Sequence, residues 1–184
     1  HSLGGAVSLA LALNHPEAVG GLALIAPLTH PREEPAAVFK PLMIGSPLLR
    51  WLVAWTLATP MSIRRAKASL AMVFGPEAVP TDYRLAAGGL LSLRPRSFIA
   101  ASTDIMAVNL DLPAMVQRYG TLQVPLGILF ARGDRLLDYR DNGEAMVTKV
   151  RDLQLTVVEG GHMLPVTQPA ESARLIREQA KRMG

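Results

Sequence analysis

Three short stretches of the sequence contain side chains that together can perform nucleophilic catalysis. Ser2 lies in His-Ser-Leu-Gly-Gly at the start of the chain, Asp134 in Arg-Gly-Asp, and His162 in Gly-Gly-His. A serine hydroxyl becomes a good nucleophile when a histidine takes its proton, and a carboxylate can orient that histidine. These residue types indicate a hydrolase with a Ser-His-Asp triad, provided that the fold brings them together.

The first stretch, His1 to Gly5, matches the G-x-S-x-G nucleophile elbow except for the first glycine, which would precede His1. In an elbow the chain leaves a strand, turns sharply and enters a helix, whose N-terminal N–H groups favour negative charge. Gly4 and Gly5 are expected where a side chain would collide with a neighbouring element. The alternative is an ordinary helix with Ser2 as its N-cap, and this stretch alone leaves both interpretations open.

Beyond Gly5, segments with helical spacing alternate with short apolar runs. Helices are predicted over 2–14, 142–150 and 168–181, and strands over 19–27, 124–131 and 153–158. This alternation predicts the α/β class, with a parallel sheet and helices on its faces. Asp134 and His162 each follow a strand, and reactive groups in such sheets gather beyond the carboxyl ends of the strands.

The middle of the chain has a different sequence pattern: prolines divide it into short segments, and none of these has the pattern of a strand. Helices are predicted there over 47–57, 62–72, 82–93 and 96–108, with another over 112–119. We therefore predict three parts: residues 1–27 and 112–184 form a catalytic domain, and residues 28–111 form a helical insertion.

The composition excludes several other functions. The 184 residues contain no cysteine, which removes disulfides and thiolate chemistry and fits a reducing, cytoplasmic compartment. The net charge of +4 comes from scattered arginines without a dense basic tract, so nucleic acid is not an expected partner. No apolar run approaches the ~20 residues of a transmembrane helix. No His, Asp and Glu cluster has the spacing of metal ligands, and no cofactor is expected.

These motifs together resemble the α/β-hydrolase fold superfamily. The resemblance is carried by His1-Ser2-Leu3-Gly4-Gly5, by Gly133-Asp134-Arg135-Leu136-Leu137 and by Gly160-Gly161-His162, in the chain order Ser, Asp, His. It implies that the chain is the C-terminal part of the fold, with strands 6–8 and a helical cap between strands 6 and 7. The first five strands and the upstream oxyanion loop are absent, so we expect residues before His1 and expect the chain alone to be inactive.

The resemblance also assigns roles. Ser2 matches the nucleophile, Asp134 the acid, and His162 the base, while the Leu3 backbone N–H matches one oxyanion-hole donor. A serine nucleophile argues against carbon–halogen and epoxide cleavage, where the family uses a carboxylate. It leaves hydrolysis of an ester or related acyl bond in a small molecule, with perhydrolysis or carbon–carbon cleavage as alternatives. A non-catalytic binding protein with the same fold is the alternative from another class.

Other ionisable residues compete less well for the site. Asp138 is the rival of Asp134, but it is better placed as the N-cap of the following helix. Glu33 and Glu34 lie in a proline-rich loop and are interpreted as surface charge, and His15 and His30 each adjoin a proline without an evident catalytic partner.

The insertion favours an apolar substrate, because it is rich in Leu, Met and Ala. Five methionines are candidates for lining an adaptable pocket, although they can equally pack the cap onto the catalytic domain: Met43, Met61, Met72, Met106 and Met163. Trp51 and Trp55 lie one helical turn apart, and the segment 47–61 has an alternative interpretation as an interfacial lid that touches lipid.

Overall fold

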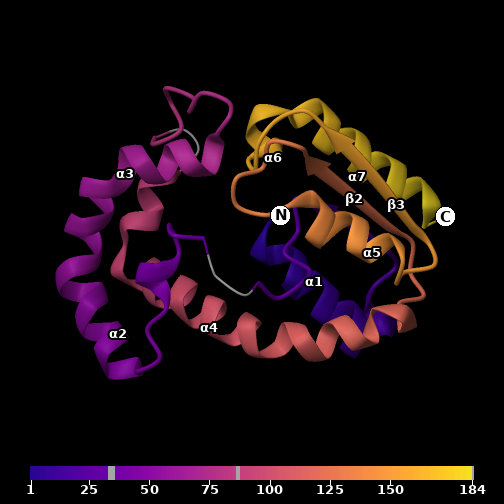
Figure 1. Cartoon of the computed structure of the whole chain (residues 1–184), viewed down its shortest axis with the longest axis horizontal. Coiled ribbons are helices and arrows are strands. Elements are labelled where there is room, and N and C mark those ends of the chain that lie inside the picture. Colours follow the sequence, from indigo (N-terminus) through magenta and orange to yellow (C-terminus); the bar gives the residue numbers. More distant parts are fainter. Residues whose placement is uncertain (33–35, 86–87, 184) are drawn as a thin grey trace.

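The computed structural model describes residues 1–32, 36–85 and 88–183. A three-stranded sheet with helices on its faces lies beside an arc of helices (Figure 1). The strands are β1 (Leu22–Ile25), β2 (Leu126–Ala131) and β3 (Leu153–Val158), in the order β1-β2-β3. Both pairings are parallel, with Leu24 beside Ile128 and Leu129 beside Thr156. The α/β class and the parallel sheet predicted from the sequence are confirmed.

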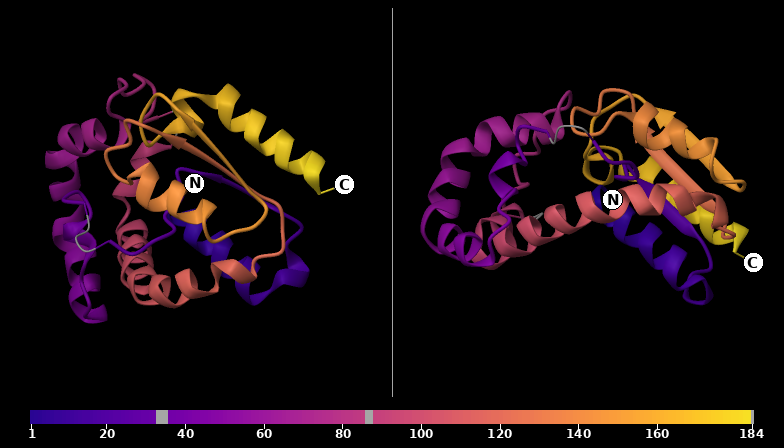
Figure 2. Two further views of the ribbon diagram at one scale, coloured as in Figure 1. Left: turned by 45° about the vertical axis from the view of Figure 1, so that its right-hand side comes forward. Right: turned by 60° about the horizontal axis from the view of Figure 1, so that its bottom comes forward.

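The two faces of the sheet are covered by different helices (Figure 2). Helix α1 (Leu3–Asn14), the short helix α5 (Ala145–Val147) and the end of α4 (Pro95–Arg118) lie on one face, where the buried cluster includes Leu9, Leu24, Leu112, Tyr119, Ile128 and Met146. Helices α6 (Leu164–Thr167) and α7 (Pro169–Arg182) cover the other, with Ile25, Leu129, Leu164 and Leu175.

All six residues of β2 are buried, because this central strand is covered on both faces. Alternate residues point to opposite faces, which is why Ile128 and Leu129 belong to different clusters. Each fully buried Leu or Ile side chain stabilises the fold by roughly 1.5–3 kcal/mol. The core therefore fixes β2, and with it the loop that begins at Arg132.

The arc is built mainly from one long, curved helical segment and from α4 (Figure 1). Helix α2 (Pro47–Val53) continues through a π-helical turn (Ala54–Ala58) into α3 (Thr59–Phe74). The side chain of Ser46 caps α2 by accepting a hydrogen bond from Leu49 N at 3.3 Å. Elsewhere, short 3₁₀ turns lie between the helices and strands of the whole chain, at Pro16–Ala18, Lys40–Leu42, Gly89–Leu93 and Tyr119–Thr121.

Two predictions for the middle of the chain are wrong. The helix predicted over 82–93 is absent: residues 82–85 form turns, residues 86 and 87 lie outside the described part, and a 3₁₀ turn follows over Gly89–Leu93. Gly88, at a φ of 70°, starts that turn in a left-handed conformation that interrupts a helix.

The helices predicted over 96–108 and 112–119 are one helix, α4, which continues through Pro113. A proline inside a helix lacks the N–H that would reach the carbonyl four residues earlier, here that of Asn109. The core contacts of Leu112 and Tyr119 hold the helix together across this position. The predicted boundary of the insertion at residue 111 thus falls inside a continuous helix, and the three-part division remains a proposal.

The segment Pro95–Thr121 is long and apolar enough to cross a membrane, by length and composition alone. The sequence prediction considered uninterrupted apolar runs, and this segment is interrupted by polar residues that include Asp104 and Asp111. One helix of this length and composition does not by itself indicate a membrane span, because core helices of other proteins can be equally long and apolar.

Candidate active site

Ser2 lies in a strained turn between His1 and the first residue of α1. Its φ of 53° and ψ of −126° are unusual for a residue with a side chain, and such a conformation costs about 1–3 kcal/mol. Ser2 N donates to the carbonyl of Ile25 at 3.2 Å, and Leu28 N donates to the carbonyl of Ser2 at 3.0 Å. These two bonds join the turn to the carboxyl end of β1.

Close packing of α1 against the segment after β1 explains one of the two glycines. A Cβ on Gly5 would lie 2.9 Å from Pro27 Cα and would also overlap Pro27 Cβ, whereas a Cβ on Gly4 would meet nothing within 4 Å. The expectation of crowding is therefore confirmed for Gly5 and wrong for Gly4.

A continuous chain of hydrogen bonds connects the serine, the histidine and the aspartate. His162 Nε2 lies 2.9 Å from Ser2 Oγ, and His162 Nδ1 lies 2.7 Å from Asp134 Oδ2. An ionised carboxylate only accepts, so Nδ1 carries a proton and Nε2 is free to accept the serine proton. The side chains of His162 and Asp134 are only 3% and 1% exposed, which shields this chain from water.

The carboxylate of Asp134 is fixed on its other side by backbone amides. Leu136 N and Leu137 N donate to Asp134 Oδ1 at 2.8 and 3.0 Å. Asp138, in contrast, accepts from Arg140 N at 2.7 Å, at the start of the next helical segment. Of the two carboxylates, Asp134 is the one that the structure places against His162.

His162 follows β3, in a loop that is tied to the loop after β2. Gly133 N donates to the carbonyl of Gly160 at 2.9 Å, and Gly160 has a φ of 132°, which favours glycine. His1 Nε2 donates to the carbonyl of His162 at 2.9 Å, and the two rings are 4.8 Å apart. The sequence analysis assigned no role to His1, because its contact spans the whole chain.

Leu3 is the first residue of α1, beside Ser2. Its N–H has no preceding turn of helix to donate to, and the helix dipole adds positive potential at this end. The amide is therefore able to stabilise a negative charge that develops near Ser2.

Asn142, which the sequence analysis missed, connects the loops after β1 and β2. Its side-chain Oδ1 accepts from Thr29 N at 3.0 Å and from His30 N at 3.3 Å, and its backbone carbonyl accepts from Thr29 Oγ1 at 2.8 Å. Tyr119 Oη donates to the carbonyl of Thr29 at 2.6 Å. No local motif marks Asn142, because its partners lie more than a hundred residues away.

The remaining candidates are placed elsewhere. His15 is 3.5 Å from Glu17 at an exposed helix end, whereas His30 packs beside Tyr119, with Nδ1 2.8 Å from Thr29 Oγ1. Since Thr29 Oγ1 donates its proton to Asn142, it accepts from His30 Nδ1–H. Burial lowers the pKa of His30, as does the nearby Lys149, while Asp141 opposes this shift. Glu33 and Glu34 lie outside the described residues.

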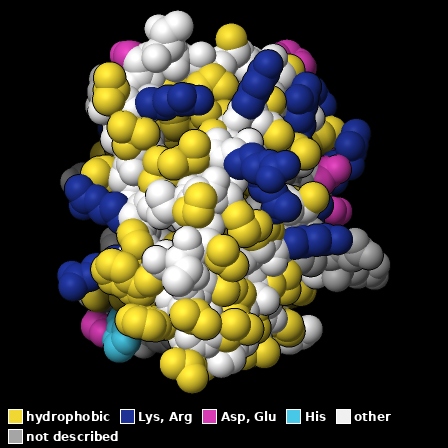
Figure 3. Space-filling view, turned by 90° about the vertical axis from the view of Figure 1, so that its left-hand side faces the viewer, with side chains coloured by type: hydrophobic (Ala, Val, Ile, Leu, Met, Phe, Trp, Pro, Cys, Tyr) yellow, Lys and Arg dark blue, Asp and Glu magenta, His cyan; other side chains and the backbone are white. Residues whose placement is uncertain are grey.

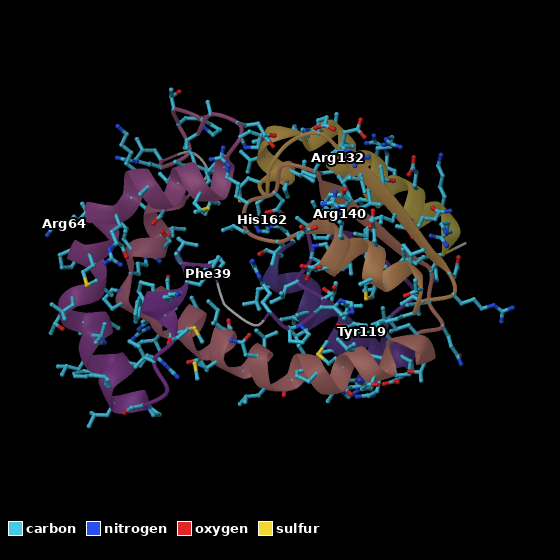
Figure 4. The ribbon with its side chains drawn as sticks, viewed as in Figure 1. Phe39, Arg64, Tyr119, Arg132, Arg140 and His162 are labelled. Carbon is cyan, nitrogen blue, oxygen red and sulfur yellow. The ribbon has the colours of Figure 1, made fainter. Side chains whose placement is uncertain are left out.

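A cavity of about 440 Å³ opens beside Ser2. Its wall is largely apolar and comes from the α1 end, the segment 28–43, α4 and the loop after β2, with Ser2, Leu3, Leu28, Arg32, Ala36, Phe39, Leu42, Met43, Ala101, Ile105, Val108, Asn109, Leu136 and Leu137. Figure 4 shows His162 between the sheet and the helical arc, with Phe39 on the arc side. Arg32 donates to the carbonyl of Leu136 and so spans two parts of the wall.

Of the five methionines predicted for this wall, Met43 is the one that lines it among the described residues. Met61 is partly exposed on α3, and Met72 packs against the main core. Within the described ranges, no group of three His, Asp or Glu side chains is arranged to hold a metal ion.

Comparison with known proteins gives structural likenesses. No family model and no curated protein sequence matches the chain. The 2-hydroxy-6-oxo-6-phenylhexa-2,4-dienoate hydrolase from Rhodococcus sp. strain RHA1 matches with a TM-score of 0.69 and 16% identity, over 98% of this chain and 62% of that one. An esterase from Exiguobacterium antarcticum matches with a TM-score of 0.68 and 16% identity, over 97% and 64%.

A lipase described as putative, from Acinetobacter baumannii, matches with a TM-score of 0.68 and 19% identity, over 98% of this chain and 59% of that one. The chain thus spans about six-tenths of the length of these structures. Its three parallel strands with their helices fit the C-terminal part of that shared architecture. The chain therefore has the C-terminal part of the α/β-hydrolase fold.

Proposed function

We propose that the protein is a serine hydrolase that cleaves an ester or related acyl bond of a small, apolar substrate. The observation that supports this most directly is the hydrogen-bonded chain from Ser2 through His162 to Asp134, which starts at a strained turn before a helix. A non-catalytic binding protein with this fold has no need of all three groups in this geometry.

In the proposed reaction, Ser2 Oγ attacks the carbonyl carbon while its proton moves to His162 Nε2. Asp134 stabilises the imidazolium that forms, and the Leu3 N–H stabilises the oxyanion, an effect of roughly 3 kcal/mol for one donor. His162 then gives the proton to the leaving group, which departs and leaves an acyl-enzyme. Water, activated by His162, hydrolyses this ester and restores Ser2.

The substrate class follows from the cavity beside Ser2. Its wall is mostly Leu, Ala, Ile, Val, Phe and Met side chains, which favour an apolar acyl or aryl group. We assign residues 28–111, some of which line the cavity, to a cap domain, and residues 1–27 and 112–184 to the catalytic domain. Carbon–carbon cleavage is the second candidate, because the similar structures include a phenylhexadienoate hydrolase and a meta-cleavage product hydrolase.

The experiment compares the full-length protein with two serine variants. Ser2→Ala is expected to abolish both labelling by a fluorophosphonate probe and turnover of a series of p-nitrophenyl esters. Ser8→Ala is the matched control, because Ser8 lies on the same helix and its hydroxyl only donates to the carbonyl of Gly4. If the Ser2→Ala variant folds like the wild type and still hydrolyses the esters at an undiminished rate, the proposal is disproved.

Two further expectations belong to this proposal. Residues 1–184 alone should lack turnover, because the family's second oxyanion donor comes from a loop that would precede His1. A cytoplasmic location is expected from the absence of cysteine, and cell fractionation checks it.

A further inference from the structure

The outer side of α2 and the π-helical turn exposes a group of large apolar side chains. Leu48 is 77% exposed, and about half of the surface of each of the others is accessible: Leu49, Trp51, Leu52 and Trp55. We call these five residues the tryptophan face. Single exposed apolar residues are ordinary, but a contiguous group of this size marks a surface that meets an apolar partner.

The tryptophan face is held in place by a polar anchor on the opposite side of the helix. The guanidinium of Arg50, which is only 9% exposed, donates to the carbonyl of Ile44 at 2.7 Å and to Thr103 Oγ1 at 2.7 Å on α4. Ala54 and Ala58 are buried on the same inner side. The exposed rings of Trp51 and Trp55 are 6.4 Å apart, so the face is preformed on a fixed helix.

Positive charge adjoins this face on α3. Arg64, Arg65 and Lys67 are exposed, and among the described residues no carboxylate pairs with them. In the sequence between residues 40 and 96, the only acidic residues are Glu77 and Asp82. Figure 3 shows apolar and basic side chains together on this side of the molecule, and Figure 4 shows Arg64 on the outside of the arc.

We propose that the tryptophan face and the adjoining basic residues bind the surface of an anionic phospholipid membrane. Trp and Leu side chains insert among the upper acyl chains, where an indole can place its ring in the apolar region and its N–H among the headgroups. Arg64, Arg65 and Lys67 then contact the lipid phosphates, which gives a preference for negatively charged lipid.

The same charges disfavour a second copy of this chain as the partner. In a two-fold symmetric dimer a surface packs against itself, so Arg64, Arg65 and Lys67 of both copies would approach one another without acidic residues between them. A lipid surface offers the complementary sign of charge together with the apolar layer. The proposed binding needs neither Ser2 nor a substrate, so it stands or fails independently of the proposed hydrolase.

The test measures co-sedimentation of the full-length protein with vesicles of phosphatidylcholine alone and of phosphatidylcholine mixed with phosphatidylglycerol. The protein is expected to pellet with the mixed vesicles, and its fluorescence to shift to the blue by an amount that W51A/W55A should lose, because Trp51 and Trp55 enter the apolar layer. W51A/W55A is expected to lower the partition coefficient about tenfold or more. R64Q/R65Q/K67Q is expected to remove the preference for anionic vesicles.

The control is Ile176→Ala, which removes a residue of similar exposure (53%) from α7 and should bind as the wild type does. Circular dichroism melting shows that each variant is folded, and Ser2→Ala should pellet like the wild type. Three outcomes overturn the proposal: no pelleting with mixed vesicles, equal pelleting of W51A/W55A, or a dimer in sedimentation velocity that W51A/W55A abolishes. The last result identifies a second copy as the occupant.

Discussion

At the scale of single residues, Asp134 and Asp138 make the clearest contrast. Both are aspartates of the loop after β2, yet Asp134 contacts His162 and Asp138 contacts Arg140 N. In the proposed mechanism only Asp134 fixes the tautomer of the histidine. Asp134→Asn is therefore expected to lower kcat for ester hydrolysis about a thousandfold or more, because the amide favours the wrong tautomer.

The matched control for this prediction is Asp138→Asn, which keeps an oxygen that can accept from Arg140 N. Its kcat should stay within a few-fold of the wild-type value. A larger loss of kcat in Asp138→Asn than in Asp134→Asn would reverse the assignment.

We expect His30 to make the stability of the fold depend on pH. Burial lowers the pKa of His30 from its ordinary value of 6.5, so the unfolded chain takes up a proton at a higher pH than the folded one. The stabilising effect of a neutral His30 is therefore complete above pH 6.5 and declines as the pH falls from 6.5 toward the lowered folded pKa. Urea unfolding between pH 8 and pH 5 should show this decline.

His30→Asn should make that decline shallower, because the amide can still donate toward Thr29 and does not titrate. His15→Asn is the control, since the side chain of His15 is 62% exposed, and its pH profile should follow the wild type. An unchanged slope in His30→Asn would show that another group carries the dependence.

At the scale of elements, the packing of α1 against the segment after β1 gives a prediction with a built-in control. Gly5→Ala is expected to lower the free energy of unfolding by about 1–3 kcal/mol, because its Cβ has no room beside Pro27. Gly4→Ala should leave stability unchanged or raise it by up to ~1 kcal/mol, because its Cβ meets open space on a helix. Urea titrations of both variants measure the difference, and equal values would contradict the packing.

The elements also show what could be predicted from the sequence. The strands and α1 were predictable, because short apolar runs bounded by turn residues and local helical spacing determine them. The helix over 82–93 was not, because Gly88 and Gly89 override the apolar spacing there. The unbroken α4 was missed for the opposite reason: tertiary contacts of Leu112 hold a helix across Pro113 that local rules would end.

The same division applies to the candidate site. Ser2 lies in a local sequence motif, and Asp134 and His162 each follow a predicted strand. Their residue types and their order could therefore be read from the sequence. The contacts of Asn142 and His1 join residues more than a hundred positions apart, and no local pattern encodes them. An apolar pocket was expected from the sequence, but of the five methionines proposed for it only Met43 lines the cavity among the described residues, because which side chains face the cavity depends on how the helices are rotated.

At the scale of the whole molecule, α4 joins the helical arc to the sheet. Its first half belongs to the arc, while Leu112 and Met115 in its second half lie in the core of the sheet, as does Tyr119 directly after it. We expect the two parts to unfold in one step. Tryptophan fluorescence, which reports the arc through Trp51 and Trp55, and circular dichroism, which reports all helices, should give the same melting midpoint.

Leu112→Ala should lower both midpoints together, with a loss of about 2–5 kcal/mol, since Leu112 is fully buried. Leu110→Ala is the control on the same helix, because Leu110 is 78% exposed, and its midpoints should barely move. Two separate transitions in the wild type would show that the arc folds by itself.

For the proposed hydrolase, the shared helix also constrains how a different substrate can be accommodated in evolution. Ala101, Ile105 and Val108 form the cavity wall only one to three turns before Leu112 enters the core. A substitution that reshapes the wall by shifting or rotating α4 also displaces the core side chains, so selectivity and stability are selected together. New specificities should therefore arise more readily from the segment 36–43, whose wall residues Phe39, Leu42 and Met43 are not on that helix.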